Sequence, residues 1–69
     1  MNYLFDSFDK AIAGILDVDV QDYCSVMDNL YKVNLIKWRF IIDGAKSGSI
    51  EDLNKSKKIF ALCLEQSKN

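Results

Sequence analysis

The stretch from residue 20 to residue 42 most constrains the fold, because its apolar residues keep a helical spacing throughout. At about 100° of turn per residue, most of them fall on one face roughly 140° wide. The members of this face are Val20, Tyr23, Cys24, Met27, Leu30, Tyr31, Leu35, Trp38, Ile41 and Ile42. An apolar face of this width is typical of a helix packed on a core. We therefore predict one long central helix over residues 20–42.

A second apolar line lies beside this face and recurs every seven residues, at Val26, Val33 and Phe40. The two lines together make more than half of the helix circumference apolar, which is wider than packing on a single core requires. We predict that the second line is an interface with another protein chain.

Two shorter helices are expected on either side, over residues 2–16 and 50–65, from apolar residues with the same spacing. Asp19 is the expected N-cap of the central helix, and Ser49 that of the last helix. The central helix should end near Gly44, which suits a left-handed cap. The sequence predicts a single all-α domain over residues 1–69, a three-helix bundle with a long central helix.

The size of the chain favours completing this bundle by oligomerisation. A chain of 69 residues buries only about 60% of its unfolded surface, so its core is small. There is no histidine, and the two cysteines are too few for a four-thiolate site, so we expect neither a metal nor a cofactor. We expect Cys24 and Cys63 to be free thiols. A homo-oligomer is the remaining source of stability, with an interface predicted from these residues: Val26, Val33, Phe40, Ile59 and Cys63.

No run approaches the roughly 20 apolar residues of a membrane span, and no signal peptide is visible. We therefore expect a cytoplasmic protein that does not enter the membrane. If the chain is encoded by a phage, this is the cytoplasm of the host cell.

Charge is distributed unevenly along the chain. Residues 1–30 carry six aspartates and one lysine, whereas residues 31–69 carry eight basic and four acidic side chains. Such a distribution can steer a partner, or it can simply be two solvated faces of opposite sign. If a protein is the target, we predict an acidic contact surface made of Asp17, Asp19, Asp22 and Asp28.

Nothing in the sequence predicts a catalytic residue. Without histidine, and without Ser or Cys beside a base, nucleophilic catalysis lacks its usual groups. The loop Gly44–Gly48 opens a helix but lacks the spacing and the terminal lysine of a Walker A motif. The sequence pI of about 5.1 also makes nucleic acid an unfavoured partner.

From Trp38 onward, WRF followed by KSGSIEDLNKSKKIFALCLE resembles a family of small phage proteins of unknown function. The pattern is matched by Trp38, Arg39, Lys46, Gly48, Glu51, Asp52, Leu53, Lys55 and Lys57. Some of these relatives are associated with nucleotide kinase activity, so the resemblance implies a nucleotide role. In that case Trp38 should pack near a base, and the phosphates should be contacted by Arg39, Lys46, Lys55 and Lys58.

The function predicted from these observations is non-enzymatic. We expect a phage-type accessory or inhibitor protein that oligomerises and binds a host protein or sequesters a nucleotide-like ligand. One alternative is a nucleotide kinase-related enzyme whose site is shared between subunits. A purely structural assembly protein is the other.

Overall fold

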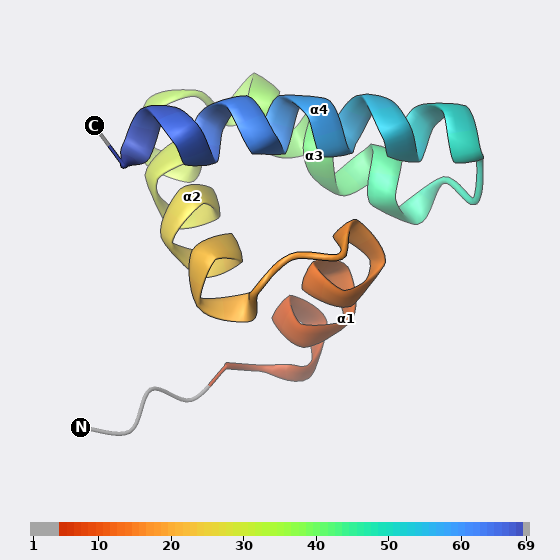
Figure 1. The fold of residues 1–69 in the computed structure, drawn as a ribbon, viewed down its shortest axis with the longest axis horizontal. Coiled ribbons are helices and arrows are strands. Elements are labelled where there is room, and N and C mark those ends of the chain that lie inside the picture. Colours follow the sequence, from red (N-terminus) through yellow and green to blue (C-terminus); the bar gives the residue numbers. More distant parts are fainter. Residues whose placement is uncertain (1–4, 69) are drawn as a thin grey trace.

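The computed structural model describes residues 5–68, which form four helices (Figure 1). Their bounds are α1 Ser7–Leu16, α2 Val20–Val33, α3 Leu35–Lys46 and α4 Ile50–Ser67. The prediction of an all-α chain is therefore confirmed for the described residues.

The first helix begins later than predicted. Asp6 is extended and its carboxylate accepts a hydrogen bond from the Asp9 N–H at 2.8 Å, so it is the N-cap of α1. Residues 2–4 of the predicted helix lie outside the described residues. The two predicted N-caps are confirmed: Asp19 accepts from the N–H groups of Gln21 and Asp22, and Ser49 accepts from that of Asp52.

The prediction of one long central helix is wrong, because the chain leaves the helical conformation at Asn34, with φ −154° and ψ 77°. The Asn34 N–H donates to the Leu30 carbonyl at 2.7 Å, and its side chain accepts from the Lys37 N–H at 3.2 Å. One residue thus ends α2 and begins α3. Asparagine is suited to this position because its amide competes with the helical backbone for hydrogen bonds.

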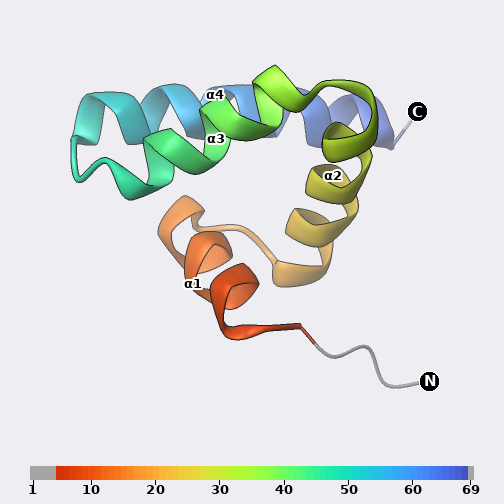
Figure 2. The ribbon, with the colours of Figure 1, turned by 180° about the vertical axis from the view of Figure 1, so that it is seen from behind.

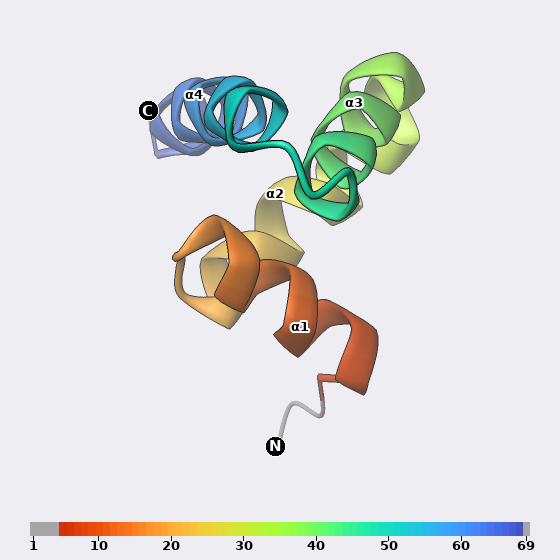
Figure 3. The same ribbon diagram turned by 90° about the vertical axis from the view of Figure 1, so that its right-hand side faces the viewer.

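The break allows α3 and α4 to form an antiparallel hairpin, while α2 turns away to pack with α1 (Figures 1 and 2). Viewed along α4, the hairpin forms one layer and α1 lies below it, with α2 connecting the two (Figure 3). A core of buried apolar side chains fills the space between these layers. It consists of Ile12, Ala13, Leu16, Tyr23, Cys24, Val26, Met27, Leu30, Ile41, Ile42, Ala45 and Phe60.

Gly44 does not end a helix, contrary to the prediction, since α3 continues through it to Lys46. Instead, Gly44 is buried against Asp52 and Ser56 of α4. A Cβ atom at this position would lie 2.8 Å from the Asp52 carbonyl oxygen, so a side chain has no room. The left-handed conformation is found at Gly48, with φ 78°, in the connection to α4.

Asn34→Ala is expected to lower the free energy of unfolding by about 1 kcal/mol, the usual cost of losing an N-cap side chain. Asn29→Ala is the matched control, because Asn29 is exposed within α2 and lies away from its ends. Urea titration followed by circular dichroism measures both. If Asn34→Ala is as stable as the wild type, the cap does not hold the break in place.

Candidate functional site

The outer face of α3 exposes apolar side chains that the core does not use. Leu35, Ile36 and Phe40 line a shallow hollow of about 350 Å³, together with Arg39 and Asp43. Ile36 is 84% exposed, although isoleucine is among the residues most often buried. We call these five residues the α3 outer face. Apolar side chains grouped in this way commonly mark an interaction site.

The residues of the predicted interface are not all on this surface. Phe40 belongs to the α3 outer face, and Val33 is exposed just before it. Val26, however, is only 2% exposed and lies in the core, so it cannot meet a second chain in this conformation. The second apolar line (Val26, Val33 and Phe40) does not form one continuous surface, because the chain changes direction at Asn34, between Val33 and Phe40. Ile59 and Cys63 are half-buried against the core.

A second hollow, of about 320 Å³, lies between α1, α2 and α3. We call it the aromatic hollow, because rings from three helices line it: Phe8, Tyr31 and Trp38. The rings of Tyr31 and Trp38 meet edge to face, with centroids 5.3 Å apart. The remaining lining residues are Asp9, Tyr23, Cys24, Met27, Asp28 and Lys32.

Burial and nearby carboxylates raise the pKa values of two groups in the aromatic hollow, Asp9 and Cys24. Burial, the negative charge of Asp6 and a hydrogen bond with Asp6 raise the pKa of Asp9, and Asp28 adds to the effect. Burial, followed by the charges of Asp9 and Asp28, raises the pKa of the Cys24 thiol to about 11. Cys24 is therefore a protonated, poorly nucleophilic thiol at neutral pH.

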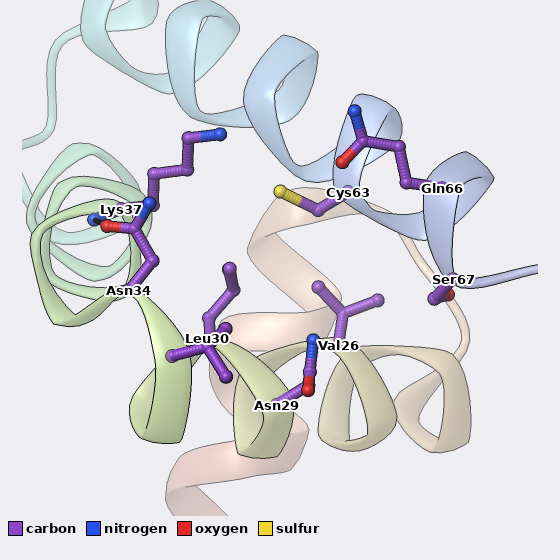
Figure 4. A pocket seen from close by; sticks show the side chains of 9 residues that line it. Val26, Asn29, Leu30, Asn34, Lys37, Cys63, Gln66 and Ser67 are labelled. Carbon is purple, nitrogen blue, oxygen red and sulfur yellow. Dashed lines mark hydrogen bonds between the residues drawn. The ribbon is translucent and has the colours of Figure 1, made fainter.

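A third hollow, of about 310 Å³, lies between α2, the start of α3 and the end of α4 (Figure 4). Its apolar wall comes from Val26, Leu30 and Val33. Its polar lining comes from Asn29, Asn34, Lys37, Gln66 and Ser67, and the Cys63 side chain projects toward it from α4. The Asn34 amide oxygen already caps α3, and the Ser67 hydroxyl donates to the Leu64 carbonyl at 2.8 Å. Two of its polar side chains, those of Asn34 and Ser67, therefore already form hydrogen bonds with the backbone at helix ends.

The five residues predicted to bind a nucleotide lie in different places. Trp38 lines the aromatic hollow, whereas Arg39 belongs to the α3 outer face. Lys46 lies in the last turn of α3, and Lys55 and Lys58 are exposed on α4. The Lys55 amine lies 3.5 Å from the Glu51 carboxylate in an exposed pair, which contributes little to stability. None of the three hollows described above is lined by two of these residues.

The four aspartates of the predicted acidic surface are also divided. Asp17 ends α1 in the left-handed conformation, with φ 61°. Asp19 caps α2 and Asp22 lies in its first turn, where the helix dipole favours negative charge. Only Asp28, in the second half of α2, lines the aromatic hollow.

No family model, no curated protein and no solved structure matches this chain. The resemblance of its second half to small phage proteins therefore stays a prediction from the sequence. Among residues 5–68, no group of three or more acidic or cysteine side chains is placed to hold a metal ion. Within the same described range, no helix is long and apolar enough to cross a membrane.

Two features of these surfaces were missed from the sequence. The first is the α3 outer face. The sequence pattern places Leu35 on the core face of the predicted central helix, whereas its side chain is exposed, and Ile36 lies outside both apolar lines of that helix. That position of Ile36 was a usable signal, because an apolar residue outside every stripe is expected to be exposed. The aromatic hollow had no such signal, because Phe8, Tyr31 and Trp38 meet only after α1 and α3 are placed against α2.

Proposed function

We propose that this chain is a non-enzymatic interaction module that forms a homo-oligomer through the α3 outer face. The observation that carries the proposal is the group of exposed apolar side chains, Leu35, Ile36 and Phe40, on one helix. Covering them with another chain removes apolar surface from water, which contributes about 25 cal/mol per Å². A chain with a core this small benefits from such a contribution.

The charges of the same face favour a second copy as the occupant. Arg39 and Asp43 lie four residues apart beside the apolar group. In a two-fold dimer the same surface faces itself, so each copy supplies both signs of charge. An antiparallel packing of two α3 helices brings Arg39 of one copy toward Asp43 of the other.

The biological role that we propose is that of an accessory or inhibitor protein, in which the oligomer presents its remaining surfaces to a host protein. The nucleotide-binding alternative has less support, because its five candidate residues are spread over separate surfaces. Burial keeps the Cys24 thiol protonated, so it would not be the nucleophile of an enzyme with a site shared between subunits. A structural assembly role requires the same self-association and no further ligand.

Light scattering on a size-exclusion column tests the self-association. The wild type should give a mass above one chain, and Ile36→Asp should reduce it to that of a monomer. Ile36→Asp should still fold, because the side chain is largely solvent-exposed. Circular dichroism checks that the helices remain.

Leu62→Asp is the matched control, since Leu62 is an exposed apolar residue on α4, outside the α3 outer face. It should leave the mass unchanged. A wild type that stays monomeric at millimolar concentration, or an Ile36→Asp variant with the wild-type mass, contradicts the proposal. If Leu62→Asp lowers the mass and Ile36→Asp does not, the interface lies on α4 instead.

A further inference from the structure

We propose that the aromatic hollow binds a small organic cation of the alkylammonium or guanidinium class. The cation is either a free molecule or the side chain of a lysine or arginine in another protein. The inference concerns a surface separate from the α3 outer face, so it does not depend on self-association.

The walls of the aromatic hollow have the chemistry that such a cation requires. Phe8 and Tyr31 are 47% and 60% exposed, and Trp38 is half-buried against the core. The faces of aromatic rings carry negative charge density and attract cations, with tryptophan the most effective. Rings supplied by α1, α2 and α3 line one hollow, so a cation can contact more than one of them.

Two carboxylates add negative charge to this aromatic lining. Asp9 comes from α1 and Asp28 from α2. Neither forms an ion pair in the described part of the chain, where the observed pair is Lys55 with Glu51 on α4. Burial raises the pKa of Asp9, and the negative charges of Asp6 and Asp28 add to this effect by repelling its carboxylate. A bound cation would relieve this repulsion.

Size and charge exclude other ligands. A volume of about 320 Å³ lies at the low end of ligand pockets, which suits a group of a few heavy atoms. Phosphates and carboxylates would be repelled by Asp9 and Asp28. Lys32, the one base among the residues described at this hollow, opposes a cation and should therefore weaken its binding.

Fluorescence titration tests the proposal directly, because Trp38 is the only tryptophan of the chain and lines the hollow. The probes are tetramethylammonium and methylguanidinium chlorides, with sodium chloride holding the ionic strength constant. We expect saturable changes with Kd on the order of 1 mM, given the affinity that a few heavy atoms can supply. The neutral isostere tert-butanol should not saturate the signal.

Three charge variants then separate a binding site from a general charge effect. Asp28→Asn should weaken binding of tetramethylammonium about five-fold, and Lys32→Gln should strengthen it by about the same factor. Glu65→Gln, which removes a negative charge from the exposed end of α4, should leave Kd unchanged. The proposal is overturned if tert-butanol binds as tightly as the cations, or if neither cation gives a saturable signal. It is also overturned if Asp28→Asn and Glu65→Gln change Kd by the same factor.

A short peptide identifies the source of the cation. A capped Gly-Arg-Gly peptide that binds more tightly than methylguanidinium supports a side chain of a partner protein. Weaker binding of the peptide supports a free small molecule. The corresponding citrulline peptide keeps the shape without the charge, and its binding with equal affinity would contradict cation recognition.

Discussion

Phe60→Ala is expected to lower the free energy of unfolding by about 3–5 kcal/mol, the range for removing a buried phenylalanine. Phe60 is 1% exposed, and its ring stacks on that of Tyr23 with centroids 6.1 Å apart. This contact joins α4 to α2, so its loss affects both layers of the fold. A chain of this length has a total stability of roughly 3–10 kcal/mol, so the substitution should remove a large part of it.

Thermal unfolding followed by circular dichroism measures this effect. Phe60→Leu keeps most of the apolar volume and should cost less than about 1.5 kcal/mol. Leu62→Ala, two residues further along α4, is the control, because an exposed side chain should change stability by no more than about 0.5 kcal/mol. A cooperative transition of Phe60→Ala at the wild-type temperature would show that the Tyr23–Phe60 contact does not hold the layers together.

Gly44→Ala should destabilise the protein by about 2 kcal/mol, although alanine is the better helix former by about 1 kcal/mol. The added Cβ atom would overlap the Ser56 hydroxyl and lie 2.8 Å from the Asp52 carbonyl oxygen. The Ser56 hydroxyl itself donates to the Phe40 carbonyl at 3.3 Å, so it is not free to move away. The variant must therefore force α3 and α4 apart.

Gly14→Ala is the matched control for this substitution. Gly14 also lies within a helix, but no atom lies within 4 Å of the Cβ position outside its own helix. It should therefore stabilise the chain by about 1 kcal/mol. Combining Gly44→Ala with Ser56→Gly should recover part of the loss, because the Asp52 carbonyl remains in place. Urea denaturation of the four proteins measures these changes, and a gain in stability for Gly44→Ala would contradict the close approach of the helices.

Short-range chemistry explains which features were predictable from the sequence. The all-α character follows from apolar residues at helical spacing, and the caps at Asp19 and Ser49 follow from side chains that bind N–H groups two or three residues away. These interactions depend only on residues within about one helical turn. They could therefore be recognised before the position of any other helix was known.

The break at Asn34 was not predicted, although its hydrogen bonds to Leu30 and Lys37 are local. Apolar spacing continues across a single non-helical residue, so periodicity predicted one helix over residues 20–42. The break is part of an arrangement in which α3 packs on α4 while α2 packs on α1. The same arrangement buries Val26 and leaves Ile36 exposed, which the pattern of one straight helix could not predict.

The amino-acid sequence by itself determined the helical class, the caps at Asp19 and Ser49 and the absence of histidine chemistry, because these depend on local hydrogen bonds and on composition. Only the tertiary structure decided which apolar residues remain exposed, why Gly44 lacks a side chain, and which rings share a hollow with Asp9 and Asp28. Each of these features joins residues from different helices. Their positions follow from how the helices cross, which residue spacing within a single helix does not specify.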